Sequence, residues 1–257
     1  RSNIPLLAGK SYKLHLMLLL AASNMNSEAF AKFKSILESV VYYTVIDKIA
    51  TNITERTFAL WCRDVRNIIT VEDLDCFVKN TIIPTVNDWK LDNKSNFLRL
   101  GLNSMQQYRI KFILGKITAY VDALKLGKTT VEDLTTYTET AVEIEHIMPQ
   151  TCTDKELYGM DEEEFAVYIN RLGNLTLLEN TINRSIQNDV YANKATYYKQ
   201  SKFYITSSIS ELVNLGQDTA INRTNSLLSS WSDWNKQAIE ERQEMFYRLS
   251  EMIWELR

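Results

Sequence analysis

The chain has 257 residues and a formal net charge of −3 at pH 7. This length allows one large or two small domains, each with a substantial core. The slightly acidic charge of the whole chain argues against a protein covered with basic residues for nucleic acid. The cysteines, Cys62, Cys76 and Cys152, are widely spaced and form no C-x-x-C pair, which excludes a paired-cysteine zinc site and indicates reduced thiols in a cytoplasmic protein.

Long helices are predicted for the first half of the chain, because glycine and proline are scarce, at seven and three residues. The apolar run at residues 16–23 follows two lysines, as in a secretory signal, but it is too short to span a bilayer. We expect a buried core helix there, with His15 as a packing residue. Further helices are predicted to begin at Ser27, after Thr54, after Thr70 and near Ser104. Pro84 is expected to end the helix that follows Thr70.

Two short strands are predicted in the second half of the chain. Residues 142–147 alternate apolar and polar side chains, as a half-buried strand does, and residues 175–178 form a second, apolar strand. The remaining elements are helices, predicted over residues 161–172, from Asn180 or Thr181, and over residues 227–256.

Chemistry is indicated where the first strand ends. His146, one of only two histidines, stands beside Glu145. If the strand stops at His146 and the chain turns at Pro149, both side chains can converge on one site instead of pointing to opposite faces. A carboxylate there can bind a metal ion while the imidazole accepts a proton from water, and Asn174 and Asn183 can hold the imidazole and complete the metal shell. This is the chemistry of phosphodiester hydrolysis.

The pattern resembles the HNH, or ββα-metal, nucleases, and most closely the C-terminal nuclease half of the GmrSD restriction endonuclease family. The string E-H-I-M-P-Q is similar to D-H-I-x-P-Q in the HNH domain of RNA-guided CRISPR nucleases. The helical residues 109–114, a K-x-x-x-Y-x-x-S stretch from Lys194 and the closing helix extend the resemblance over most of the chain, and residues 143–201 are its most specific part. Glu145 stands where many HNH nucleases carry Asp, and a longer carboxylate can still reach a hard cation.

The resemblance implies a role for each site residue. His146 would be the general base, and Asn174 would orient it through its side-chain amide or its backbone carbonyl. Glu145 and Asn183 would bind one divalent cation, Mg²⁺ or Mn²⁺, because both ligands are oxygens. Asn188 competes with Asn183 for the metal. Taken alone, Asn174 is also typical of a turn, and Asn183 of a helix start.

The charge distribution indicates where DNA would bind. Residues 131–170 hold eleven acidic residues, whereas residues 171–202 carry more basic than acidic side chains. We therefore expect the phosphate-facing surface on the later segment, with Arg184 and Lys194 as substrate-binding residues. Lone cations on a helix are otherwise usually solvated surface.

Together these features predict a mainly α fold in three parts. A helical domain is expected over residues 1–138, an embedded HNH ββα-metal nuclease core over residues 139–203, and a helical segment over residues 204–257 whose long C-terminal helix packs back on the helical domain. The predicted function is that of a metal-dependent DNA endonuclease, the effector part of a bacterial restriction or phage-defence enzyme, with no membrane segment.

The resemblance also implies a partner. In this family an N-terminal domain, similar to a nucleotide-dependent sensor with a D-G-Q-Q-R motif, usually controls cleavage of DNA that can carry modified bases. The chain lacks that motif and an initiator Met, so we expect the sensor to be missing from it. Two alternatives stand beside the nuclease: a DNA- or protein-binding helical module with a degenerate nuclease site, and an all-helical scaffold in which the motif is a coincidence.

Overall fold

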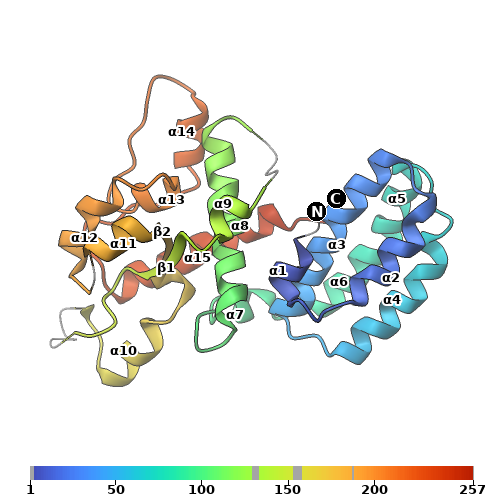
Figure 1. Cartoon of the computed structure of the whole chain (residues 1–257), viewed down its shortest axis with the longest axis horizontal. Coiled ribbons are helices and arrows are strands. Elements are labelled where there is room, and N and C mark those ends of the chain that lie inside the picture. Colours follow the sequence, from blue (N-terminus) through green and yellow to red (C-terminus); the bar gives the residue numbers. More distant parts are fainter. Residues whose placement is uncertain (1–2, 129–132, 153–157, 187, 257) are drawn as a thin grey trace. The chain divides into compact units, whose positions relative to one another are not determined.

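The structure, a computed structural model, describes residues 3–128, 133–152, 158–186 and 188–256. The chain forms two compact units (Figure 1). Unit 1 extends to Phe97 and takes in Trp254, and unit 2 is Leu98–Ile253. The prediction of a mainly α fold is confirmed, since the described residues contain a single sheet, of two strands, among many helices.

Unit 1 contains only helices and turns among its described residues. Its elements are α1 (Ile4–Ala8), α2 (Leu14–Ala21), the 3₁₀ helix η1 (Ala22–Asn24), α3 (Ser27–Ile46), α4 (Thr51–Val65), α5 (Val71–Phe77), the π-helical η2 (Val78–Ile82), α6 (Ile83–Trp89) and α7 (Asn93–Phe97). The predicted core helix is α2. Its His15 is 3% exposed and stacks on the ring of Tyr12, so it packs in the core as predicted, but its buried Nδ1 has no hydrogen-bond partner among the described residues.

The start of α5 follows from its sequence, whereas its end does not. Thr70 Oγ1 accepts a hydrogen bond from Asp73 N, and the Asp73 carboxylate accepts one from Thr70 N, which makes the reciprocal cap expected from this spacing. The prediction that Pro84 ends the helix was wrong. The helical path continues through η2, and Pro84 lies in the first turn of α6, where its missing N–H is tolerated.

Unit 2 holds the sheet and the helices around it. Its elements are α8 (Gln107–Lys125), α9 (Thr135–Thr138), β1 (Val142–His146), α10 (Glu162–Tyr168), the 3₁₀ helix η4 (Leu172–Asn174), β2 (Leu175–Glu179), α11 (Asn180–Ile186), α12 (Tyr191–Tyr198), α13 (Tyr204–Ser207), α14 (Ala220–Asn225) and α15 (Lys236–Ile253). The prediction placed α8 in the helical domain over residues 1–138, but α8 lies in unit 2, where it contacts β2 and α15. Over the described ranges, no helix is long and apolar enough to cross a membrane.

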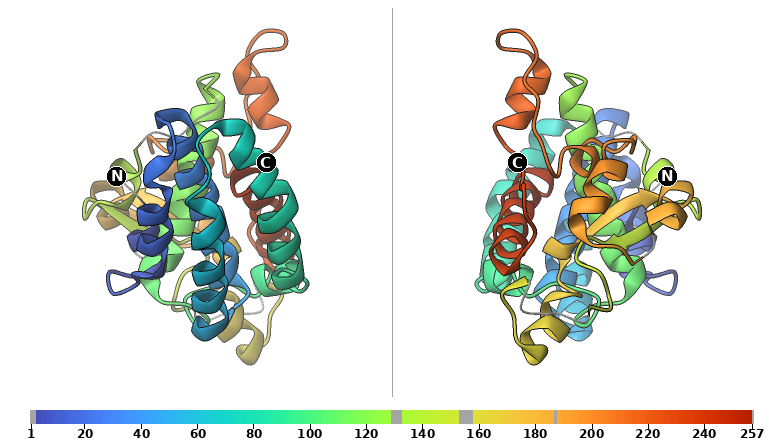
Figure 2. Two further views of the ribbon diagram at one scale, coloured as in Figure 1. Left: turned by 90° about the vertical axis from the view of Figure 1, so that its right-hand side faces the viewer. Right: turned by 90° about the vertical axis from the view of Figure 1, so that its left-hand side faces the viewer.

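The sheet and the helix after it form a small β-β-α arrangement. Strands β1 and β2 pair antiparallel, with Glu145 opposite Thr176 and His146 opposite Leu175. The strands lie side by side in Figure 1 and in the right-hand view of Figure 2. Helix α11 follows β2 directly and contacts both strands. The end of β1 and the start of α11 are therefore held close together.

Helix α15 closes on the turn before β2. It contacts η4, and a Cβ on Gly173 would lie only 2.2 Å from the carbonyl oxygen of Ile239, so this approach requires glycine. The prediction of a final helix over residues 227–256 was wrong at its start. Helix α15 begins at Lys236, and Trp234 precedes it in an irregular segment.

Candidate active site

A cavity of about 640 Å³ lies at the end of β1. It brings together four of the predicted site residues, namely Glu145, His146, Asn183 and Lys194. Strand β1 ends at His146, one residue before the end of the predicted strand, and both Glu145 and His146 line the cavity. These two residues are only 6% and 8% exposed. A carboxylate and an imidazole are therefore neighbours in one cavity.

Glu145 is held by two side chains from α12. The Lys194 ammonium donates to Glu145 Oε1 at 2.7 Å and to the carbonyl of His146 at 2.8 Å, and the Tyr198 hydroxyl donates to the same Oε1 at 3.0 Å. Lys194 and Tyr198 reach the same oxygen because they are four residues apart on one face of the helix. Oε2 of Glu145 makes no hydrogen bond with any residue that the structure describes.

Lys194 is therefore placed differently from the prediction. It was expected to contact DNA phosphate, but it is only 1% exposed and its charge is paired with Glu145. A buried carboxylate needs such a partner, because an unpaired charge away from water is costly. In the structure, Lys194 holds the carboxylate of Glu145 in place through this ion pair.

The imidazole of His146 has neighbours that the sequence did not indicate. Burial lowers its pKa below the ordinary value, the charge of Lys194 lowers it further, and a hydrogen bond with the side chain of Asn170 acts in the opposite direction. Gln150 Nε2 lies 3.5 Å from His146 Nε2. Gly101 fixes the backbone of Asn170, since a Cβ at Gly101 would lie 2.1 Å from the Asn170 carbonyl oxygen. No signal in the sequence connected Asn170 with His146.

Asn174 holds the chain after His146 and not the imidazole. Its backbone carbonyl accepts from Ile147 N at 2.9 Å, and its side-chain Oδ1 accepts from Met148 N at 2.8 Å and from Trp234 Nε1 at 2.9 Å. Its Nδ2 donates to the carbonyl of Ile169 at 2.9 Å. The predicted contact with His146 is not among these bonds, because the amide of Asn174 is already used by backbone groups and a tryptophan. Asn174 thus fixes the turn on which His146 depends.

Helix α15 secures the backbone on both sides of Asn174. Arg242 Nη1 donates to the carbonyls of Gly173 at 2.9 Å and Leu175 at 2.7 Å, and Gln243 Oε1 accepts from Gly173 N at 2.5 Å. Arg242 is fully buried, and burial lowers its pKa to about 9, which leaves the guanidinium charged at neutral pH. The sequence alone did not indicate this role of Arg242.

The two candidate asparagine ligands are distinguished by their hydrogen bonds. Asn188 Nδ2 donates to the carbonyl and the hydroxyl of Thr151 at 2.8 and 2.5 Å, and Asn188 Oδ1 accepts from Thr151 N at 3.4 Å. Asn183 Nδ2 donates to Glu143 Oε2 at 2.7 Å, and its Oδ1 makes no hydrogen bond with the described residues. Both residues line the cavity, but only Asn183 presents an oxygen without a partner there.

The basic side chains of residues 171–202 are less available than their number indicates. Lys194 is buried, Lys199 pairs with Glu211 at 3.0 Å, and the Arg171 guanidinium lies 4.3 Å from the centre of the Tyr168 ring. Arg184 on α11 is exposed and makes no ion pair with a described residue. Arg184 is thus the predicted phosphate-binding residue that the structure leaves accessible.

The sequence of this part of the chain matches a known protein family. Residues 86–249 match the protein family described as GmrSD restriction endonucleases, C-terminal domain, and this match covers more than half of the chain. The chain belongs to the GmrSD family. Every residue of the cavity described above lies within the GmrSD match. The chain is accordingly a nuclease domain of the restriction endonuclease type. No curated protein matches it.

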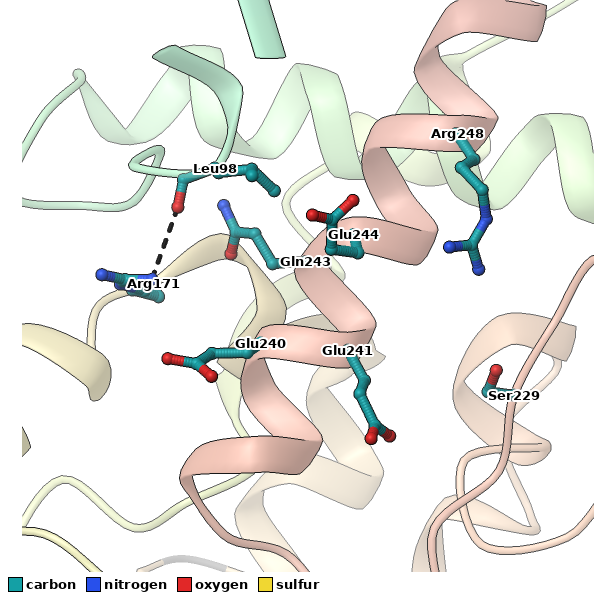
Figure 3. Close-up of a pocket in the computed structure, with 8 residues that line it drawn as sticks. All are labelled: Leu98, Arg171, Ser229, Glu240, Glu241, Gln243, Glu244 and Arg248. Carbon is teal, nitrogen blue, oxygen red and sulfur yellow. Dashed lines mark hydrogen bonds between the residues drawn. The ribbon is translucent and has the colours of Figure 1, made fainter. Parts of the chain in front are cut away.

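The GmrSD segment contains a second cavity, of about 500 Å³, against α15 (Figure 3). The glutamates Glu240, Glu241 and Glu244 project from α15, and Arg171 donates to the carbonyl of Leu98 beside them. The Tyr168 hydroxyl donates to Glu240, and Trp231 Nε1 donates to Glu241, so two of the carboxylates serve local structure. This cavity has no histidine and none of the predicted site residues.

Proposed function

We propose that the chain is an HNH-type, metal-dependent DNA endonuclease, the effector part of a bacterial restriction or phage-defence enzyme. One observation carries the proposal: His146, Glu145 and Asn183 line a single cavity at the end of a β-β-α unit. In its neutral form His146 accepts a proton from the water that attacks phosphorus. The sensor domain implied by the family resemblance would belong to a separate segment or subunit that licenses cleavage.

The donors in the cavity fit a hard divalent cation. Glu145 Oε2 and Asn183 Oδ1 are both oxygens without a hydrogen-bond partner among the described residues, and oxygen ligands suit Mg²⁺ or Mn²⁺. No group of three or more His, Cys, Asp or Glu that could hold a metal occurs in the described ranges, so water and the substrate phosphate would complete the shell. A bound cation would supply positive charge to the phosphate and to the leaving oxygen.

The chain's own charges make metal binding depend on the substrate. Lys194 offsets the negative charge of Glu145 at 2.7 Å, and Asn183 is neutral. We therefore expect weak affinity for Mg²⁺ in the free protein and stronger affinity once a phosphate reaches the cavity.

A plasmid nicking assay tests the proposed function. Cleavage should require Mg²⁺ or Mn²⁺ and should stop in EDTA. The reason is that the bound cation would supply the positive charge that stabilises the negative charge developing on the phosphate. Parallel reactions with plain, glucosylated and phosphorothioated DNA would identify the preferred substrate. Full cleavage in chelator would reject a metal nuclease.

Arg184 should contribute to DNA binding. Arg184→Ala should weaken binding of any DNA sequence and lower the slope of log affinity against log salt by about 0.9, the contribution of one phosphate contact. Arg63→Ala is the matched control, since this arginine is 82% exposed and lies in unit 1. Binding by fluorescence anisotropy at several salt concentrations measures both slopes. Equal slopes for Arg184→Ala and wild type would place the DNA elsewhere.

The alternative function is a DNA- or protein-binding module with a degenerate nuclease site. The ammonium of Lys194 favours it, because a cation already lies against Glu145, the only carboxylate among the described residues that line the cavity. DNA binding without cleavage, under every metal condition, would support this alternative.

A further inference from the structure

Glu143 is the hydrogen-bond partner of Asn183. It lies two residues before Glu145 on β1, so both side chains point to the same side of the strand. Its Oε2 accepts the hydrogen bond from Asn183 Nδ2 at 2.7 Å. Glu143 is absent from the residues that line the cavity, whereas Asn183 is among them.

An amide side chain has two unlike ends. Its oxygen can bind a cation, whereas its NH₂ group can only donate hydrogen bonds. An asparagine that rotates by half a turn about its last bond exchanges the two ends, so a free asparagine presents the wrong end for part of the time. A neighbour that is only an acceptor removes this ambiguity, because the amide must turn its NH₂ group towards it.

Glu143 is such a neighbour, since an ionised carboxylate accepts and does not donate. Lys111 supplies a positive charge nearby: its ammonium donates to the carbonyls of Glu139 at 2.8 Å and Val142 at 2.6 Å, and it interacts electrostatically with Glu143. The hydrogen bond of 2.7 Å from Nδ2 to Glu143 thus turns the NH₂ group of Asn183 towards the carboxylate and its oxygen away from it.

We propose that Glu143 is a positioning residue, which turns the amide of Asn183 so that Oδ1 faces the cavity as a ligand for the divalent cation. This inference rests on the proposed function. In this role Glu143 determines which end of the Asn183 amide faces the cavity. A contribution of negative charge alone would not depend on the orientation of the amide.

Exchanging the carboxylate and the amide between Glu143 and Asn183 distinguishes orientation of the amide from an effect of charge alone. In Asn183→Asp, two carboxylates face each other, and we expect their repulsion to displace the new ligand. In the double variant Asn183→Asp with Glu143→Gln, the glutamine amide donates to one aspartate oxygen and leaves the other for the cation. The double variant should bind Mn²⁺ at least about tenfold more tightly than Asn183→Asp, as one hydrogen bond to a charged group would produce. If Glu143 acted through charge alone, the order would be opposite, because the single variant carries one more negative charge.

Mn²⁺ binding is measured without DNA, by electron paramagnetic resonance of the free ion, and with plasmid, from the Mn²⁺ concentration that gives half-maximal nicking. Thermal melts select variants that fold, and Glu143→Gln alone completes the cycle. Equal binding by the two variants, or tighter binding by Asn183→Asp, would overturn the inference and leave the proposed function intact as long as the wild type cleaves. A wild type that neither binds Mn²⁺ nor cleaves would overturn both.

Discussion

His146→Ala should reduce metal-dependent plasmid nicking on the order of 10²-fold or more, the usual contribution of a general base. His146 is the only histidine that lines the cavity, and alanine removes the imidazole that would accept the proton of the attacking water. Initial rates of nicking at saturating Mn²⁺ measure the effect. Metal binding should change little, because the proposed ligands are Glu145 and Asn183.

The matched control is the other histidine. His15 is also buried, at 3% exposure, but it lies in unit 1 against the Tyr12 ring. His15→Gln should retain nicking, provided that circular dichroism shows both variants folded. Wild-type rates in His146→Ala would remove the base from the proposal.

The second large effect concerns stability. Lys194→Met should lower the free energy of unfolding by about 3–5 kcal/mol, because it leaves the carboxylate of Glu145 buried without its partner. Urea unfolding followed by tryptophan fluorescence measures the change. Tyr198→Phe, which removes the other bond to Glu145 Oε1, should cost only about 1 kcal/mol.

A double variant isolates the ion pair. Lys194→Met combined with Glu145→Gln removes both charges, so most of the lost stability should return. Nicking should not return, since the proposed ligand is gone. If the double variant is as unstable as the sum of its parts, packing of the lysine chain, and not the ion pair, explains the loss.

The sequence predicted where the site is better than it predicted how the site is held. The strand itself was predicted to within one residue from its alternating pattern and the turn at Pro149, which are local signals. The partner of Glu145 was not predictable in this way, because Lys194 lies 49 residues away and its position on a helix does not show which face is buried. The spacing of Lys194 and Tyr198 showed only that they share a face. For this reason Lys194 was assigned to DNA.

The predicted start of the last helix was wrong for a related reason. Trp231 and Trp234 continue the apolar pattern of α15, so the pattern predicted a longer helix. Trp234 instead serves Asn174 with its indole N–H, and Asn235 caps the helix by accepting from Ala238 N at 3.0 Å. An asparagine three residues before a helical N–H is a helix-start signal. The prediction followed the apolar periodicity alone and did not consider Asn235.

The hydrogen bonds between α15 and the turn before β2 bear on the order in which the site can fold. Arg242 and Gln243 reach Gly173 across 69 and 70 residues of chain. Contacts of such long sequence separation form late in folding, because the entropy of closing the loop must be overcome first. When β1, β2 and α11 have emerged from the ribosome, the nascent chain contains the proposed base and both proposed ligands. It still lacks the side chains of α15 that hold the backbone around Asn174. We therefore expect the cavity to assemble only after α15 is made, so a nascent chain that ends before α15 should lack nuclease activity.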